Sequence, residues 1–216
     1  MKVEAVTALA LPDVKVVRFA RFHDSRGYFT EPFRRGDFDQ HPDLSFLRGL
    51  ALPQMNESWS KAGVVRGLHF QWNPYMGKLV RCVHGRLVDL FLDIRLGSPT
   101  FGKIAAHDMS APSDAPSGEW IWLPPGFAHG VFFTVESRIE YLCSGEYNPA
   151  CEAGLSPLAG DLDWSLCDPG LKGEYDALLA NGAVLSEKDR HGLSLTAWAA
   201  DSRAQHFTYE ALQATG

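Results

Sequence analysis

Residues 78–94 read KLVRCVHGRLVDLFLDI, two short runs of β-forming residues joined by His84-Gly85. The second run mixes apolar and polar side chains, as in Leu87-Val88-Asp89-Leu90-Phe91-Leu92-Asp93. Short runs that alternate between apolar and polar residues are typical of half-buried β-strands. Because glycine adopts positive φ angles without steric cost, His84-Gly85 predicts a tight hairpin turn between two strands.

Similar runs recur on both sides of this stretch, and the 20 glycines and 13 prolines are spread among them. The further predicted strands are Val14–Ala20, Val64–Gln71, Lys103–Met109, Glu119–Leu123, Gly130–Val135 and Arg138–Gly145. Short strands at spacings of about 8–12 residues favour a β-sandwich or a barrel. The few helical patterns are Arg35–Gln40, which suits a short helix or a turn, Glu174–Ala180 and Thr208–Ala214. Residues 150–216 lack a strand pattern, so we expect them to be a tail packed on the barrel within one domain, 1–216.

Composition excludes several classes of protein. The 216 residues are 45% hydrophobic and 21% charged, which is ordinary for a globular chain with a real core. The net charge of −6 argues against a nucleic-acid partner, which needs a clustered basic surface, but it allows a small anionic ligand. No apolar run approaches about 20 residues, the N-terminus is a poor signal peptide, and the four cysteines form no Cys-x-x-Cys pair. We therefore expect a cytoplasmic protein with no membrane partner.

Three polar residues inside the predicted strands are candidates for chemistry, because burying a polar group needs a reason. They are His69, Lys78 and Tyr141. Each also has a plain structural interpretation: a hydrogen-bonded core histidine, a solvated lysine at a strand start, or a core tyrosine whose hydroxyl meets water. Alternation along Val64–Gln71 places Arg66, Leu68 and Phe70 on one face and Val65, Gly67, His69 and Gln71 on the other.

The segment Pro124-Pro125-Gly126-Phe127-Ala128-His129-Gly130 resembles the second cupin motif, in which PxGxxH turns into a strand. In metal-binding cupins this histidine works with an HxH pair and a glutamate. Here His69-Phe70-Gln71 replaces HxH, and Asn73-Pro74-Tyr75-Met76 stands where the glutamate is expected. One or two imidazoles without a carboxylate make a poor site for a divalent metal. We expect a cupin-like jelly-roll β-barrel, mainly β with a few short, mostly C-terminal helices, and a site without metal.

Seven segments occur along the chain in a recognisable order and spacing. They are Asp24-Ser25-Arg26-Gly27-Tyr28-Phe29-Thr30-Glu31, Gln54-Met55-Asn56-Glu57-Ser58, Arg66-Gly67-Leu68-His69-Phe70-Gln71, Lys78-Leu79-Val80-Arg81, Ser98-Pro99-Thr100-Phe101-Gly102, Trp122-Leu123-Pro124-Pro125-Gly126-Phe127-Ala128-His129-Gly130 and Leu185-Ser186-Glu187-Lys188-Asp189. Together they resemble the dTDP-4-dehydrorhamnose 3,5-epimerase family of nucleotide-sugar epimerases, over roughly residues 14–190. Any one segment is a weak signal, but seven in order are strong evidence.

The resemblance implies four catalytic residues: His69 as the base, Asp189 as its dyad partner, Lys78 beside the keto oxygen of the substrate, and Tyr141 as the acid. It also implies substrate contacts from Arg26, Glu31, Gln54, Asn56, Arg66, His129, Glu152 and Lys188, with Phe29 lying along the nucleotide base. For Asp189 the alternative is a helix N-cap or a surface residue.

These residue types suit inversion of a carbon beside a ketone, because the carbanion delocalises onto oxygen as an enolate. Imidazole is a good base near neutral pH, and a carboxylate on its far nitrogen fixes the tautomer. A fixed cation stabilises the enolate more than the ketone, and a phenol is protonated at neutral pH and able to donate. Arg26 and Arg66 suit a diphosphate. No cofactor is needed.

The implied substrate is a dTDP-4-keto-6-deoxyhexose, epimerised at C3, C5 or both. The resemblance also implies a homodimer that pairs through N-terminal strands, each subunit contributing residues to its neighbour's nucleotide site. Alternatives are an epimerase acting at C3 alone or C5 alone, a cupin sugar-nucleotide ketoisomerase, a non-catalytic nucleotide-sugar-binding module and, less favoured, a metal-dependent cupin oxygenase.

Two segments depart from the family pattern. Trp72, Tyr75 and Met76 are bulkier than expected in the loop between His69 and Lys78, and the tail after Asp189 carries no family motif. These departures leave the exact sugar open.

Overall fold

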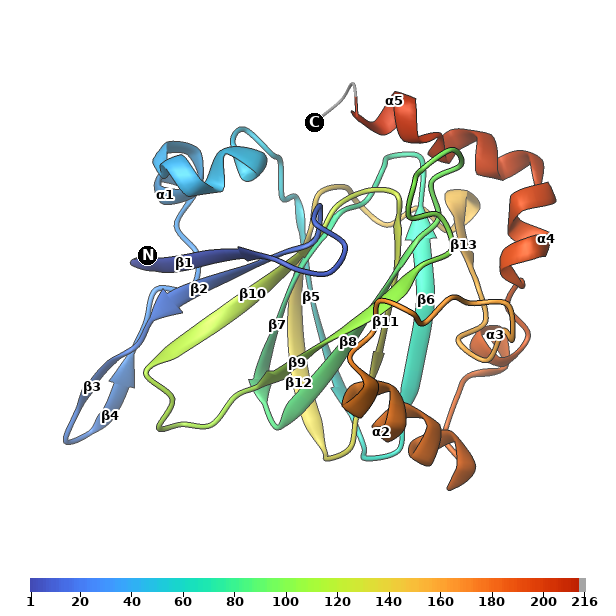
Figure 1. The fold of residues 1–216 in the computed structure, drawn as a ribbon. Coiled ribbons are helices and arrows are strands. Elements are labelled where there is room, and N and C mark those ends of the chain that lie inside the picture. The colour runs from blue at the N-terminus through green and yellow to red at the C-terminus, as the bar shows by residue number, and fades with distance from the viewer. Residues whose placement is uncertain (214–216) are drawn as a thin grey trace.

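The computed structural model describes residues 1–213, and two antiparallel sheets packed face to face dominate it (Figure 1). The first sheet has the strand order β1 (Val3–Ala8), β2 (Lys15–Ala20), β10 (Ser117–Leu123), β7 (Lys78–His84), β12 (Ser137–Cys143) and β5 (Gln54–Ser60). The second has the order β13 (Glu152–Gly154), β6 (Val65–Gln71), β11 (Phe127–Phe132), β8 (Arg86–Asp93) and β9 (Ile104–Ser110). This jelly-roll sandwich confirms the mainly β, cupin-like fold predicted from the sequence.

A third, two-stranded element lies apart from both sheets. β3 (Phe22–Asp24) and β4 (Gly27–Phe29) form a hairpin that extends away from the body of the molecule (Figure 1).

Three apolar clusters hold the layers together. The cluster between the sheets includes Val80 and Ile121 from one sheet and Phe91 and Val131 from the other. A second covers the outer face of the first sheet, where Val17, Trp120 and Leu142 meet Phe38 and Leu44. The third covers the outer face of the second sheet, where Leu68, Phe70 and Leu92 meet Trp198 and Phe207 of the C-terminal segment. The C-terminal segment therefore contributes to the core beside β6.

Helices are short and mostly C-terminal, as predicted. They are α1 (Arg35–Gln40), α2 (Pro169–Ala180), α3 (Glu187–Arg190), α4 (Leu195–Ala200) and α5 (Tyr209–Gln213), with 3₁₀ turns η1 (Pro42–Leu47), η2 (Pro149–Cys151) and η3 (Ser202–Phe207). Of the helix and the turn expected over 35–40, the structure has the helix. The helix predicted over 174–180 begins earlier, at Pro169, because the Asp168 carboxylate caps its first turn. The predicted helix 208–214 corresponds to α5, and Ala214 lies outside the described residues.

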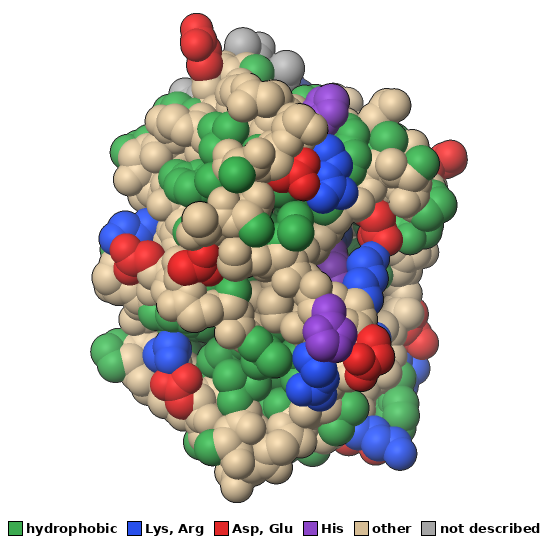
Figure 2. All heavy atoms as spheres, turned by 90° about the vertical axis from the view of Figure 1, so that its right-hand side faces the viewer, with side chains coloured by type: hydrophobic (Ala, Val, Ile, Leu, Met, Phe, Trp, Pro, Cys, Tyr) green, Lys and Arg blue, Asp and Glu red, His purple; other side chains and the backbone are tan. Residues whose placement is uncertain are grey.

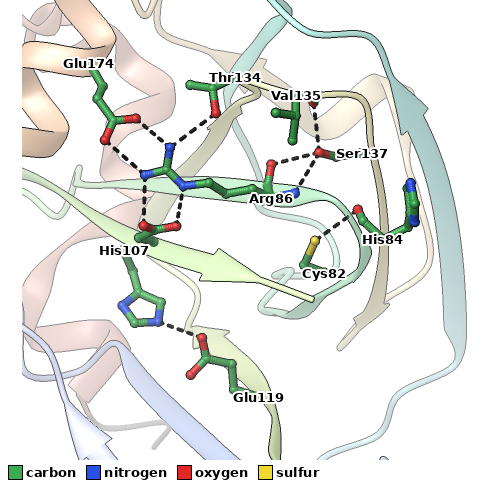
Figure 3. A network of polar contacts seen from close by, with 10 residues as sticks. Cys82, His84, Arg86, His107, Glu119, Thr134, Val135, Ser137 and Glu174 are labelled. Carbon is green, nitrogen blue, oxygen red and sulfur yellow. Dashed lines mark hydrogen bonds and ion pairs between the residues drawn. The ribbon is translucent and has the colours of Figure 1, made fainter. Parts of the chain in front are cut away.

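Arg86 on β8 fastens α2 to the second sheet (Figure 3). Its guanidinium donates to Glu174 of α2 at 2.6 Å and to Asp108 of β9 at 2.8 Å. These two hydrogen bonds raise the pKa of Arg86 well above its ordinary value, so it stays a cation. A partly buried forked pair of this kind fixes orientation as well as position.

The hairpin predicted at His84-Gly85 is wrong, although the turn exists. Gly85 has a φ of +79°, and a Cβ there would lie 2.3 Å from the Glu136 carbonyl oxygen. The flanking strands β7 and β8 belong to different sheets. The turn is thus a corner between the two layers, because local turn chemistry does not specify which sheet the next strand joins.

Strict alternation along β6 is also wrong. Val65, Leu68 and Phe70 all lie in one apolar cluster, so the two-residue period breaks at Gly67. Arg66 is exposed and donates to Ser60 and Trp59 of β5 instead of sharing a face with Leu68 and Phe70.

The break coincides with a β-bulge between β6 and β11. His129 lies opposite His69, and the register then shifts before Val131. Gly67 has a φ of +112°, and a Cβ there would lie only 2.4 Å from the Gly130 Cα. Two glycines thus allow the backbones to approach closely, and the bulge places His69 beside His129.

Candidate active site

A cavity of about 380 Å³ is bounded by strands of both sheets. Its lining includes six residues predicted for the site: Gln54, Asn56, His69, Lys78, Tyr141 and Glu152. They come from β5, β6, β7, β12 and β13, so the sandwich gathers residues that are far apart in the sequence. Such convergence of polar groups in one concave site is typical of ligand binding.

His69 and Asp189 form a close pair at this cavity. The His69 Nε2 lies 2.6 Å from Asp189 Oδ1, and the imidazole is 32% exposed, whereas the carboxylate is 5% exposed. Asp189 lies on α3, whose N-cap is Ser186, so the alternative that Asp189 is the N-cap or a surface residue is wrong. The pair presents a reachable imidazole backed by a buried carboxylate.

Asp189 is ionised in this setting. Burial works against its charge, but hydrogen bonds from His69, Ser186 and the Gly67 backbone outweigh burial and hold the pKa of Asp189 below its ordinary value. Hydrogen bonds donated to a carboxylate stabilise its charged form. It can therefore stabilise an imidazolium on His69.

Lys78 begins β7 and lies between Leu123 of β10 and Cys143 of β12, so it is not a solvated edge residue. Burial lowers the pKa of Lys78, partly offset by Cys143, Asp89 and Glu152. Within residues 1–213, no hydrogen bond or ion pair engages its Nζ. This leaves the lysine free to meet an oxygen in the cavity.

Tyr141 lies on β12, directly opposite Asn56 of β5. Burial, aided by Cys143, raises the pKa of Tyr141, and a hydrogen bond with Asn56 and the charge of Arg66 counteract only part of this. The phenol is therefore protonated at neutral pH and can donate a proton.

A second histidine–carboxylate pair lies beside the first. His129 Nε2 is 2.9 Å from Asp89 Oδ2, and both side chains are buried. Burial lowers the pKa of His129, against the opposing pull of Asp89. The other oxygen of Asp89 has no hydrogen-bond partner among the described residues. Sequence reasoning did not select Asp89, although an aspartate among the apolar residues of β8 was a visible signal.

Two predicted substrate contacts lie at the edge of the cavity. Lys188 forms an ion pair with Glu152. It also lines a second cavity of about 290 Å³, together with His69, Asp189, His191 and Arg203. His69 lines both cavities. On the face drawn in Figure 2, basic, acidic and histidine side chains gather around a hollow.

The N-terminal contacts are not brought to this cavity. Arg26 is 88% exposed and pairs only with Asp24 among the described residues, while Phe29 is 64% exposed. Both lie on the β3–β4 hairpin or its turn, and Glu31 lies near the N-terminal amine of Met1.

Sequence reasoning missed several lining residues, among them Tyr147, Met76 and Gln71. The exposed Tyr147 donates its hydroxyl to Glu152 at 2.9 Å. It lies in the Tyr147-Asn148-Pro149 segment, which is outside the seven segments that carry the family resemblance. Its exposure and its place in the cavity lining become visible only in the folded structure.

Within residues 1–213, no group of three or more His, Cys, Asp or Glu side chains is arranged to hold a metal ion. No helix in that range has the length and apolar character needed to cross a bilayer.

Known proteins share this architecture. The sequence profile of the dTDP-4-dehydrorhamnose 3,5-epimerase family matches residues 8–197. A dTDP-4-dehydrorhamnose 3,5-epimerase of Sinorhizobium fredii is 38% identical over 192 residues, which cover 87% of this chain and 88% of that protein.

Two solved structures show the same fold. One is a dTDP-6-deoxy-D-glucose-3,5-epimerase of Legionella pneumophila in complex with dTDP-4-keto-L-rhamnose, with a TM-score of 0.76, 29% identity, and coverage of 94% of this chain and 97% of that one. The other is a 3'-monoepimerase of Streptomyces bikiniensis in complex with dTDP-quinovose, with a TM-score of 0.71, 26% identity, and coverage of 100% of this chain and 96% of that one. This chain belongs to the dTDP-4-dehydrorhamnose 3,5-epimerase family of carbohydrate epimerases.

Proposed function

We propose that this epimerase acts without a cofactor on a dTDP-4-keto-6-deoxy sugar and inverts C3, C5 or both. The observation that carries the proposal is the grouping of the His69–Asp189 pair, the half-buried Lys78 and the protonated Tyr141 around one cavity. Base, cation and acid are the three groups that inversion beside a ketone needs.

The proposed cycle moves protons and leaves the sugar's oxidation state unchanged. His69 removes the proton from the carbon beside the keto group, and the C–H electron pair shifts to the keto oxygen as an enolate. Lys78 stabilises the oxygen's negative charge, and Asp189 stabilises the imidazolium. Tyr141 then protonates the opposite face of the carbon, and exchange with solvent restores His69 and Tyr141.

In this proposal, binding of the dTDP group requires residues of a second subunit. Gln54, Asn56 and Glu152 line the cavity. Arg66 lies on β6, His129 lies opposite His69, and Lys188 forms an ion pair with Glu152. Arg26, Phe29 and Glu31 lie elsewhere in their own chain. We therefore propose a homodimer in which Arg26, Phe29 and Glu31 of the partner subunit complete the site for the dTDP group.

Proton exchange tests the proposal. The protein is incubated with dTDP-4-keto-6-deoxyglucose in heavy water, and deuterium at C3 and C5 is followed by NMR, with His69→Ala and Tyr141→Phe as variants. We expect deuterium at both carbons for a 3,5-epimerase, and its loss in His69→Ala.

Other outcomes identify the alternatives. Deuterium at one carbon only would indicate a single-site epimerase, an alternative favoured by the match to a 3'-monoepimerase. Migration of the carbonyl between C3 and C4 would identify a ketoisomerase. Binding of dTDP without any exchange would contradict catalysis on this sugar and favour another sugar or a binding module.

A further inference from the structure

The two segments that depart from the family pattern contact each other. Trp72 in the loop after β6 stacks on His206 of η3, with ring centroids 5.5 Å apart and planes at 9°. The Tyr75 hydroxyl donates to the His206 carbonyl oxygen at 2.6 Å, and its ring meets Phe207 edge-on at 5.7 Å. The family profile ends at residue 197, so η3 lies beyond it.

η3 is firmly attached to the body of the molecule. Phe207 is fully buried against Phe70 and Trp198, with ring centroids 5.3 and 5.9 Å away. Its carbonyl accepts from the Leu96 backbone at 2.8 Å, and Tyr209 donates back to Leu96 at 2.9 Å. The exposed ring of His206 therefore projects from a fixed segment, and it is the loop that gains order from the contact.

The loop leads directly into the catalytic cavity. Met76 lines that cavity, Gly77 follows it, and Lys78 is the next residue. Gly77 donates to Ser144 at 2.7 Å, and a Cβ on Gly77 would lie 2.4 Å from the Trp122 ring. The far end of the loop is therefore seated against Ser144 and Trp122, and Met76 and Gly77 form the direct covalent link between Tyr75 and Lys78.

We propose that η3, residues 202–207, is a positioning element for catalysis: it holds Trp72 and Tyr75 and thereby sets the position of Met76 and Lys78. This rests on the proposed function, since it gives Lys78 the role of stabilising the enolate. A small misplacement of such a cation costs rate, because its value depends on its distance from the charge that develops on the keto oxygen. Nucleotide binding, which depends on other residues, is unaffected.

The test compares His206→Ala with His206→Phe, which keeps a flat ring for Trp72. We expect His206→Ala to lower kcat by about three- to tenfold, the range for loss of one aromatic contact, while KM and the Kd for dTDP stay within about twofold. His206→Phe restores kcat. The matched control is His84→Ala, an exposed histidine at the end of β7.

A double-mutant cycle adds a second criterion. If Trp72 and His206 act through one contact, the double variant Trp72→Ala/His206→Ala is no slower than the slower single variant. Equal kcat in wild type and His206→Ala would overturn the proposal. An equal loss in His206→Ala and His206→Phe would also overturn it.

Hydrogen–deuterium exchange of residues 72–78 separates this proposal from the proposed function, because it needs no substrate. We expect faster amide exchange in His206→Ala and in Tyr75→Phe, with unchanged exchange in β7 beyond Lys78. If wild type failed to exchange the sugar protons, the proposed function would fail, and the amide exchange would still decide whether η3 holds the loop. Unchanged exchange in both variants would overturn the role of η3.

Discussion

At the scale of single residues, Asp189 determines what His69 can do. Its carboxylate accepts from the Nε2 of His69 and is held by Ser186 and the Gly67 backbone. A carboxylate on Nε2 keeps a proton there, which leaves Nδ1 as the nitrogen free to accept one. Within residues 1–213, Nδ1 makes no hydrogen bond, consistent with a base.

We expect Asp189→Asn to lower kcat by about 10²–10⁴-fold, because the amide no longer fixes the tautomer or stabilises the imidazolium. The Kd for dTDP should change little. Steady-state kinetics and calorimetric titration measure the two quantities. Asp176→Asn on α2, which removes an exposed carboxylate paired with Lys172, is the control. A kcat within twofold of wild type in Asp189→Asn would contradict the dyad.

The pH dependence of the rate distinguishes Lys78 from Tyr141. The pKa of Lys78 is lowered from 10.5 and that of Tyr141 is raised from 10.0. In the proposed mechanism Lys78 acts as a cation, so activity is present below its folded pKa and is lost as pH rises through that value. Burial favours loss of the Lys78 proton and opposes loss of the Tyr141 proton, so we expect the alkaline fall in kcat/KM to follow the deprotonation of Lys78.

Lys78→Arg provides the check, because guanidinium stays charged at every accessible pH. The residual activity of this variant should fall at a higher pH than the activity of wild type. In Tyr141→Phe the alkaline fall should occur at the same pH as in wild type. The activity of this variant is followed as residual proton exchange at the carbon that His69 deprotonates. A fall that disappears in Tyr141→Phe but persists unshifted in Lys78→Arg would contradict the assignment.

At the scale of elements, the β6–β11 bulge positions both histidines. Gly67→Ala would place a methyl group 2.4 Å from the Gly130 Cα and 2.7 Å from the His129 carbonyl oxygen, at a φ that L residues avoid. These contacts are with backbone atoms, which cannot move aside to relieve the clash as the end of a flexible side chain can. We expect a loss of at least about 2 kcal/mol in the free energy of unfolding, measured by urea denaturation.

Gly173→Ala is the matched control. Gly173 lies exposed in α2, and apart from the backbone of its own helix and its chain neighbours no heavy atom lies within 4 Å of the position that an added methyl group would take. The substitution should therefore stabilise the protein by about 0.5–1 kcal/mol. A Gly67→Ala variant as stable as wild type would show that the two strands can separate without cost.

Elements that carry a strong local pattern were predictable, and those that depend on neighbours were not. The run in β8 is almost entirely buried and was recognised from its apolar residues. β5, Gln54–Ser60, was missed because it lies at a sheet edge with alternate residues half-buried and exposed, so its polar sequence resembles a loop. Alternation in β6 failed because the bulge depends on the close approach of Gly130.

The site residues could likewise be predicted only as far as the sequence itself carries a pattern, and their contacts could not. His69 and Asp189, 120 positions apart, were paired through resemblance, and their 2.6 Å contact is a product of tertiary folding. Nothing in the residues around Trp72 indicates that it would meet His206.

At the scale of the whole molecule, the position of the β3–β4 hairpin demands an explanation. The hairpin extends from the body of the molecule (Figure 1) and exposes Phe22, Tyr28 and Phe29 by 49%, 43% and 64%. Large exposed apolar side chains grouped on a projecting element are typical of an interface. Arg26, at its turn, forms an ion pair only with Asp24 among the described residues, so it keeps donors for a phosphate.

The proposed homodimer therefore predicts that each hairpin acts in the other subunit's site. Light scattering at micromolar concentration should give twice the chain mass, and Arg26→Ala and His69→Ala should each be inactive alone. Mixed dimers of the two variants contain one site with both defects and one with neither. Random reassortment of equal amounts should restore about one quarter of wild-type activity, because half of the dimers are mixed and half of their sites are intact. A monomer in solution, or mixed dimers with no activity, would contradict a shared site.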